Sequence, residues 1–122
     1  MDRAHAITVI AQAVHESIRT YQAALGERAS PPWEQAGEMQ QWSRDAVEFA
    51  LSHPTPGAQH EEWISAKRRD GWTFGPTKDL AKKTHPSLVP FDQLPESEKA
   101  KDAMLIAVVQ ALARVLGVAG SP

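Results

Sequence analysis

Residues 63–95 read WISAKRRDGWTFGPTKDLAKKTHPSLVPFDQLP, and this stretch differs in composition from the rest of the chain. Its first part, residues 63–83, holds six lysine and arginine residues against two aspartates, which gives a local net charge of +4. Residues 1–62 hold four basic and nine acidic residues, and the whole chain of 122 residues has a formal net charge of −2. A local cationic segment in a mildly acidic chain indicates one site for an anionic ligand rather than a surface for a polyanion.

The second part of the stretch, residues 71–95, shows no helical or strand period. Two glycines and four prolines interrupt any long element between Gly71 and Pro95. The segment nevertheless carries large apolar side chains, which disordered segments tend to lack. We therefore expect an ordered wrap over the helices, in which Trp72 and Phe74 pack into the protein.

Outside this wrap the apolar residues recur at helical spacing, which predicts helices near residues 3–25, 38–52, 59–70 and 96–116. The first has an apolar stripe and leaves His15 off it, facing solvent; the second has an inward face that includes Trp42. The stripe residues of the first are Ile7, Ile10, Val14, Ile18, Tyr21 and Leu25, and the face of the second is Met39, Trp42, Ala46, Phe49 and Ala50.

The predicted helix over residues 96–116 is the most apolar one. Pro95 suits its first turn, and Gly117 suits its end. Its 3/4-spaced residues are Met104, Ala107, Val108, Ala111, Leu112 and Val115, and Leu105, Ile106, Val109 and Leu116 widen the stripe. An apolar surface over most of the circumference predicts that this helix is the hydrophobic centre.

These patterns predict a mainly α fold: a compact helical domain of about four helices with a long ordered Pro/Gly-rich wrap. We expect a single domain over residues 1–122, made of an N-terminal helical segment (1–57) and a second unit (58–117). The absence of cysteine excludes disulfides and thiolate metal sites. No apolar run is long enough for a membrane span and the N-terminus does not resemble a signal peptide, so we expect a cytoplasmic protein.

Trp63 and Lys67 lie four residues apart and so share one face of the predicted third helix. A tryptophan with a cation one turn along can present a stacking plane and an anion donor together. Alternatively, Trp63 anchors the core and the Lys67 stem passes alongside it. The residue pattern leaves both interpretations open.

The sequence shows no pattern for catalysis. No nucleophile elbow, metal-spaced histidine pair or phosphate-binding glycine loop is present, so we expect neither an enzyme nor a metal or other cofactor. Nucleotide binding needs a flat π surface and phosphate donors. Trp63 can supply the surface, Lys67, His85 and Lys78 the donors, and Asp102 can accept from a ribose hydroxyl or an exocyclic amine.

The stretch also carries residues that resemble the ryanodine-receptor repeat, or RyR domain, over roughly residues 60–117. These are Trp63, Lys67, the run Gly71-Trp72-Thr73-Phe74-Gly75, Lys78-Asp79, His85-Pro86, Leu88-Val89-Pro90-Phe91, Leu94-Pro95, Lys99 and Asp102. The N-terminal helix and PPW segment are similar to those of short, free-standing phage and bacterial members. In the channel repeats an adenine nucleotide binds in the equivalent region.

The resemblance implies a ligand site in which a tryptophan matching Trp63 stacks on the base. It places the residues that match Lys67, His85, Ser87 and Asp102 close by. Ser87 stands where the channel repeats have a basic residue, and Lys67, His85 and Asp102 are substitutions as well. Two channel repeats share one site, so the resemblance also implies that a homodimer could complete it.

The residue patterns and the resemblance leave two hypotheses for the function, a ligand-binding domain and a protein-interaction domain. The first is a non-catalytic domain that binds an adenine-type nucleotide, with no membrane or nucleic acid polymer as partner. Such a domain could act as a phage sponge against nucleotide signalling in the host cytoplasm. The second is a structural or protein-interaction domain without a small ligand, in which the cationic segment meets an acidic partner.

Overall fold

A computed structural model describes residues 1–120 of the chain. The described residues form four α-helices: α1 (Arg3–Ala24), α2 (Met39–Ser52), α3 (Pro56–Arg69) and α4 (Glu96–Leu116). Between them lie the 3-10 turns η1 (Trp33–Gln35) and η2 (Phe91–Gln93) and the two-residue strands β1 (Thr73–Phe74) and β2 (Thr84–His85). The predicted mainly α fold is confirmed, and each helix begins and ends within one turn of its predicted bounds.

The helix ends follow from local chemistry. The Asp2 side chain caps α1 by accepting a hydrogen bond from the backbone N–H of His5 at 2.8 Å. Thr55 caps α3 in the same way, and Pro56 occupies its first turn. Gly117 ends α4 with a left-handed backbone (φ 69°), as the sequence predicts.

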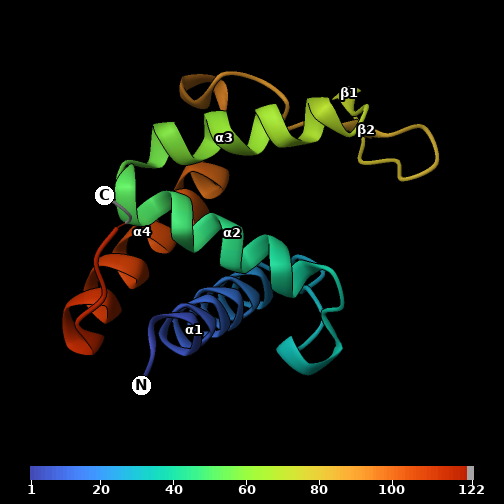
Figure 1. Cartoon of the computed structure of the whole chain (residues 1–122). Coiled ribbons are helices and arrows are strands. Elements are labelled where there is room, and N and C mark those ends of the chain that lie inside the picture. Colours follow the sequence, from blue (N-terminus) through green and yellow to red (C-terminus); the bar gives the residue numbers. More distant parts are fainter. Residues whose placement is uncertain (121–122) are drawn as a thin grey trace.

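Helices α1, α2 and α4 pack together, and α3 lies against α4 (Figure 1). Their shared core contains Trp33 of η1, which fills the space between the helices. The helical members of the core are Ile7, Ile10, Ala11, Val14, Val47, Ala50, Leu105, Val109 and Ala113. A second, smaller cluster of Ile64, Trp72 and Leu88 joins α3 to the wrap, with Trp63 packed against it.

The wrap is ordered, as predicted, and its two strands pair in parallel with Thr73 opposite Thr84 and Phe74 opposite His85. The loop between the strands projects beyond the C-terminal end of α3 (Figure 1). Gly75 is required at the start of this loop, because a Cβ there would come within 2.6 Å of the Thr84 Cβ. This pairing holds His85 next to the end of α3.

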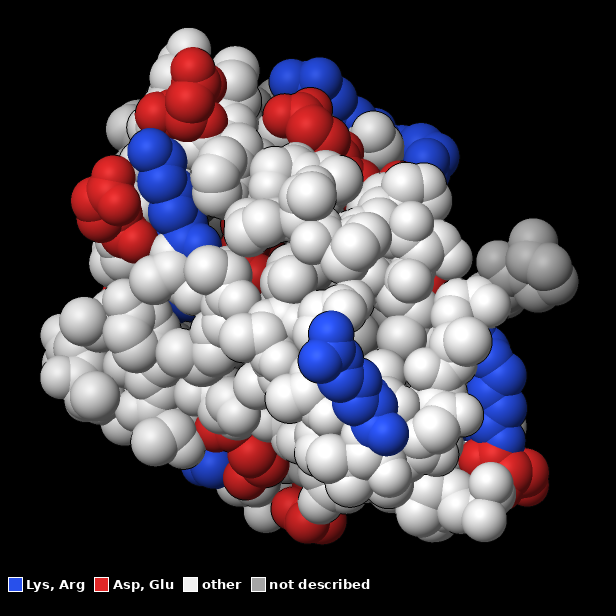
Figure 2. Space-filling model, turned by 90° about the vertical axis from the view of Figure 1, so that its left-hand side faces the viewer, with Lys and Arg blue, Asp and Glu red and all other residues white. Residues whose placement is uncertain are grey.

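The centre of the buried face of α4 differs from the predicted one by one residue along the helix. Leu105, Val109 and Ala113 face the core, whereas Val115 is 78% exposed. Leu112 only packs against the edge of the core. Since α4 is apolar around most of its circumference, its neighbours α1 and α2 decide which stripe is buried. Figure 2 shows a face on the α4 side of the molecule with a broad uncharged area and charged side chains mainly toward its margins.

Three further sequence expectations were wrong. His15 is buried, with its Nε2 2.7 Å from the Pro31 carbonyl oxygen and its ring edge-on to Trp33. Trp42 is 55% exposed, because α2 turns that side away from α1. Phe74 is 60% exposed, whereas Trp72 is buried as predicted. None of the helices in residues 1–120 combines the length and the apolar character that a membrane span requires.

Candidate functional site

A cavity of about 290 Å³ lies where α3, the start of α4 and the segment after β2 meet. Gln22 of α1 and Ala46 of α2 form part of its wall. The other lining residues are Gln59, His60, Trp63, His85, Ser87, Leu94, Glu98, Lys101, Asp102 and Leu105. Four of the six residues that we predicted for the site are among them, namely Trp63, His85, Ser87 and Asp102.

Helix α3 supplies one face of the site. Gln59, Trp63 and Lys67 follow one another at intervals of four residues, so their side chains form one row along the helix. Gln59 and Trp63 line the cavity, and Lys67 lies one turn farther toward the C-terminal end of α3.

The Trp63 ring is half-buried between two histidines. The His60 ring is stacked on it at 5.5 Å between centroids, with an angle of 20° between the planes. The His85 ring meets it at 5.0 Å and 76°. The histidines therefore fix the orientation of the indole and restrict where a planar ligand could stack.

His60 is the most buried ionisable residue of the cavity, at 4% exposed. Its Nε2 lies 2.8 Å from the carbonyl oxygen of Val89. Because a carbonyl oxygen can only accept, Nε2 must carry a proton. The other ring nitrogen, Nδ1, lies 3.8 Å from Oδ2 of Asp102. His60 thus links the wrap to the first turns of α4.

Burial raises the pKa of Asp102 from its ordinary value of 3.8 to about 6. His60 opposes this rise in the pKa of Asp102, whereas the negative charge of Glu98 adds to it. Near neutral pH Asp102 can therefore either accept hydrogen bonds as a carboxylate or, in its minor protonated form, donate one.

His85 is held as a neutral ring. Its Nδ1 accepts a hydrogen bond from the backbone N–H of Ser87 at 3.0 Å, so the proton of the neutral ring is on Nε2. Burial lowers the pKa of His85, and the positive charges of Lys78 and Lys67 lower it further. His85 can therefore donate one hydrogen bond from Nε2.

Lys67 is surrounded by three tryptophans. Its ammonium nitrogen lies 4.7 Å from the ring centroid of Trp72, 5.1 Å from that of Trp42 and 5.9 Å from that of Trp63. These distances are typical of cation–π contacts. Burial lowers the pKa of Lys67, as does the charge of Lys78, and Asp70 opposes both.

The charged groups around the cavity differ from one side to the other. On α4, Lys101 is paired with Glu98 and Glu27, which leaves the carboxyl group of Asp102. Lys67, Lys78 and His85 lie toward the end of α3 and β2. Lys78 lies close enough to lower the pKa of Lys67, and both lysines lower the pKa of His85, in addition to the effect of burial. A ligand with a negative group would therefore meet a positive potential on the β2 side.

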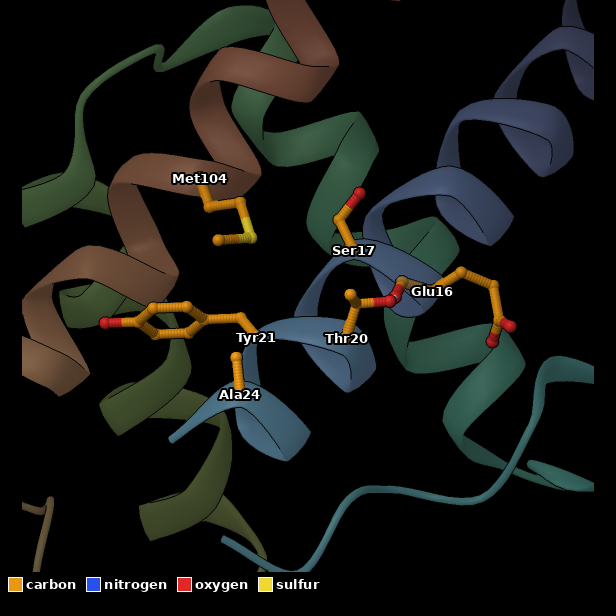
Figure 3. A pocket seen from close by; sticks show the side chains of 6 residues that line it. All are labelled: Glu16, Ser17, Thr20, Tyr21, Ala24 and Met104. Atoms are coloured by element: carbon orange, nitrogen blue, oxygen red, sulfur yellow. The ribbon is translucent and has the colours of Figure 1, made fainter. Parts of the chain in front are cut away.

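A second hollow is an open groove of about 610 Å³ between α1 and α4 (Figure 3). Five of its lining residues come from α1, and Met104 of α4 faces Tyr21 across it. Its only charged lining residue is Glu16, which pairs with Arg19. The six lining residues of this groove include hydroxyl groups but no cationic side chain, and Glu16 would repel an anionic ligand. Within residues 1–120, no group of three or more His, Asp or Glu side chains is arranged to hold a metal ion.

The family of the chain can be assigned. The model of the RyR domain family matches residues 51–118, which is more than half of the 122 residues. The chain belongs to the RyR domain family.

The RyR domain match begins within α2 and includes α3, the wrap and α4. It therefore covers every lining residue of the cavity except Gln22 and Ala46. Of the predicted site residues, Lys67 and Lys78 do not line the cavity of this RyR domain. Lys67 lies among the tryptophans, and Lys78 is exposed in the projecting loop. The nearby Lys83 does not line the cavity either, because its ammonium group contacts the backbone oxygen and the carboxylate of Asp70.

Sequence reasoning missed Gln59 and His60 as site residues of this RyR domain. His60 forms no metal-spaced pair with another histidine, so the search for metal patterns did not single it out. A usable signal existed, since residues 59, 63 and 67 occupy one helical row and His60 lies beside it. Lys101 was missed for another reason: it bridges Glu27 and Glu98, and no local pattern predicts a contact 74 residues apart.

Proposed function

We propose that this RyR domain binds a small nucleotide with an adenine-type base and catalyses no reaction on it. The observation that carries the proposal is that Trp63, His85, Ser87 and Asp102 line one cavity. These residues come from α3, the segment around β2 and α4, so their assembly depends on the fold rather than on sequence proximity.

The carboxyl group of Asp102 on one side of the cavity and the cationic groups near His85 on the other support a ligand with two chemically different ends. Phosphate would lie on the side of His85, with Lys67 and Lys78 at the rim, where added negative charge would favour the protonated forms of both Lys67 and His85. Base and ribose would lie toward Trp63 and Asp102. Base–aromatic stacking contributes about 1–3 kcal/mol per base, which makes Trp63 the main anchor in this proposal.

The cavity volume supports a small ligand. At about 290 Å³ the cavity lies at the lower end of the range of about 300–1,000 Å³ usual for ligand pockets. A mononucleotide or a fragment of a larger signalling nucleotide suits this volume better than a polymer does. A homodimer that completes the site, and a role as a sponge for a nucleotide signal in a phage-infected cell, belong to the same proposal.

A second candidate function, a protein-interaction domain, is favoured by the projecting loop. Phe74 is 60% exposed and Leu80 is 73% exposed. Two exposed lysines are close to them in the sequence: Lys78 lies between Phe74 and Leu80, and Lys82 follows Leu80. An apolar surface with adjacent cations suits an acidic protein partner.

The nucleotide proposal is tested by replacing Trp63 in two ways. Trp63→Leu keeps an apolar side chain but removes the flat ring, whereas Trp63→Phe keeps a smaller ring. Calorimetric titration with AMP should show affinity reduced about 5- to 150-fold in Trp63→Leu, as expected for the loss of stacking. Trp63→Phe should retain most of the affinity.

Thermal unfolding serves as the control for intact structure, because both variants alter a half-buried residue. If the folded Trp63→Leu protein binds AMP as tightly as the parent does, Trp63 is not the stacking platform. If the parent binds neither AMP, ADP nor ADP-ribose, the interaction-domain candidate becomes the better one.

A further inference from the structure

We infer that Gln59 recognises the edge of the base and selects a 6-aminopurine over a 6-oxopurine. This inference rests on the proposed function, since it concerns the base that would stack on Trp63. It assigns a specificity-determining role to Gln59, which lies on the same helical row as Trp63 and Lys67.

The environment of Gln59 is unusual for an amide. The residue is 5% exposed and lines the cavity. Its Nε2 donates to the carbonyl oxygen of Ala46 at 3.3 Å. Because that carbonyl can only accept, the contact fixes which end of the amide is nitrogen. Oε1 therefore occupies the other position, where it is buried and has no hydrogen-bond partner within residues 1–120.

A buried acceptor without a partner favours a ligand that brings a donor. Leaving such a group unsatisfied costs free energy that a matching N–H would recover. The 6-amino group of adenine is a donor, whereas the 6-oxo group of hypoxanthine is an acceptor. A 6-oxopurine would place two acceptors against each other, so Gln59 should disfavour it.

The amide of Gln59 also has the complete pattern that adenine requires. Glutamine recognises adenine by accepting from the 6-amino group and donating to N7. One hydrogen of the Gln59 Nε2 group is used by Ala46, and the second remains for such a bond. The two contacts together would distinguish adenine from hypoxanthine at the same edge of the base.

The position of Gln59 in its helix agrees with this role. Gln59 lies one turn before Trp63, and Lys67 lies one turn after it, on the same row of α3. A base stacked on Trp63 could thus direct its polar edge toward Gln59 and its phosphate toward Lys67. Base edge, base plane and phosphate would be recognised in order along the helix.

The other amide and the central histidine of the cavity are already engaged. Gln22 uses its Oε1 to accept from the backbone N–H of Ser30 at 2.8 Å. His60 uses Nε2 for Val89 and directs Nδ1 toward Asp102. Gln59 Oε1 is therefore a buried neutral acceptor of a cavity-lining residue that still lacks a partner within residues 1–120.

The test compares two nucleotides that differ at the 6-position of the base. Calorimetric titration of the parent with AMP and with IMP should show AMP binding about 5- to 150-fold tighter, as expected for satisfying one buried acceptor. Gln59→Met preserves length and apolar volume but removes the amide. We expect this variant to bind AMP more weakly than the parent does and to lose the preference for AMP over IMP, because the acceptor that disfavours the 6-oxo group is removed as well.

Gln12→Met is the matched control, because Gln12 is exposed on α1 and lies outside the cavity. It should keep the preference of the parent for AMP. Equal affinity of the parent for AMP and IMP would overturn the role of Gln59 while leaving nucleotide binding intact. Failure of the parent to bind either nucleotide would overturn both proposals, and this comparison requires no variant to fold.

Discussion

Three ionisable residues in or next to the cavity have pKa values that are shifted toward their neutral forms. Asp102 has a raised pKa, and Lys67 and His85 have lowered ones, each mainly because of burial. Burial thus disfavours the charged form at three neighbouring positions. Such clustering is common at functional sites, although structural networks produce it as well.

Asp102 permits a test that needs no ligand. Because its pKa is about 6 in the folded protein and 3.8 ordinarily, folding takes up a proton between about pH 4 and pH 6. Its contribution to the free energy of unfolding therefore falls as the pH rises through this range. Asp102→Asn should remove this loss and stabilise the protein by about 1 kcal/mol at pH 7.5, a value reduced from the full shift because the carboxyl group is partly exposed.

Thermal unfolding of parent and Asp102→Asn between pH 4 and pH 8 measures this difference. The two melting curves should converge near pH 4, where the parent carboxyl group is protonated in both states. A variant that is less stable than the parent at pH 7.5 would show that the His60–Asp102 contact outweighs the cost of burying the carboxylate.

Sequence alone could identify only some residues of the site. The four-residue spacing predicted that Trp63 and Lys67 share a face of α3. His85, Ser87 and Asp102 could be placed beside them mainly through the resemblance to the RyR domain. The same spacing also places Gln59 on that row, but the missing partner of its amide oxygen depends on packing and leaves no pattern in the chain.

At the scale of elements, α4 presents two different apolar surfaces. Val109 is fully buried against α1 and α2, and Val115 is 78% exposed six positions later. A valine-to-alanine substitution can therefore be compared at a buried and at an exposed position of the same helix. Val109→Ala should lower the free energy of unfolding by about 1.5–3 kcal/mol through lost burial and a residual cavity. Val115→Ala should change it by less than about 0.5 kcal/mol.

Urea unfolding monitored by circular dichroism gives both values, and the two variants have the same helix propensity. Similar losses for Val109→Ala and Val115→Ala would mean that both faces of α4 are covered in solution. That outcome would point to contact between copies of the chain rather than to an error in the helix position.

The bounds of the helices were predictable, whereas the buried face of α4 was not. Asp2, Pro56 and Gly117 mark helix ends through chemistry that is local in the sequence. The buried face depends on which neighbours α4 meets, and an all-round apolar helix contains no such information. Trp42 illustrates the same limit, since it follows the helical period of α2 yet lies beside Lys67 on the surface.

At the scale of the whole molecule, apolar surface remains after the core is complete. Beyond the core, α4 exposes Ala107, Ala111 and Val115, which share one face at four-residue spacing. Figure 2 shows a largely uncharged area on this side of the molecule, crossed near its middle by one Lys or Arg side chain. The open groove between α1 and α4 borders the same helix (Figure 3). A helical face that is apolar except for the exposed Arg114 suits pairing with a second copy.

We therefore expect a dimer in which α4 lies near the two-fold axis. Light scattering after size exclusion at high micromolar concentration should give about twice the chain mass of 13.4 kDa. Val115→Arg should shift the mass to that of a monomer, because two copies would place like charges against each other across the axis. Val115→Ala keeps the face apolar and should remain dimeric. A parent protein that elutes with the mass of one chain would contradict the dimer and leave the cavity of a single copy as the whole site.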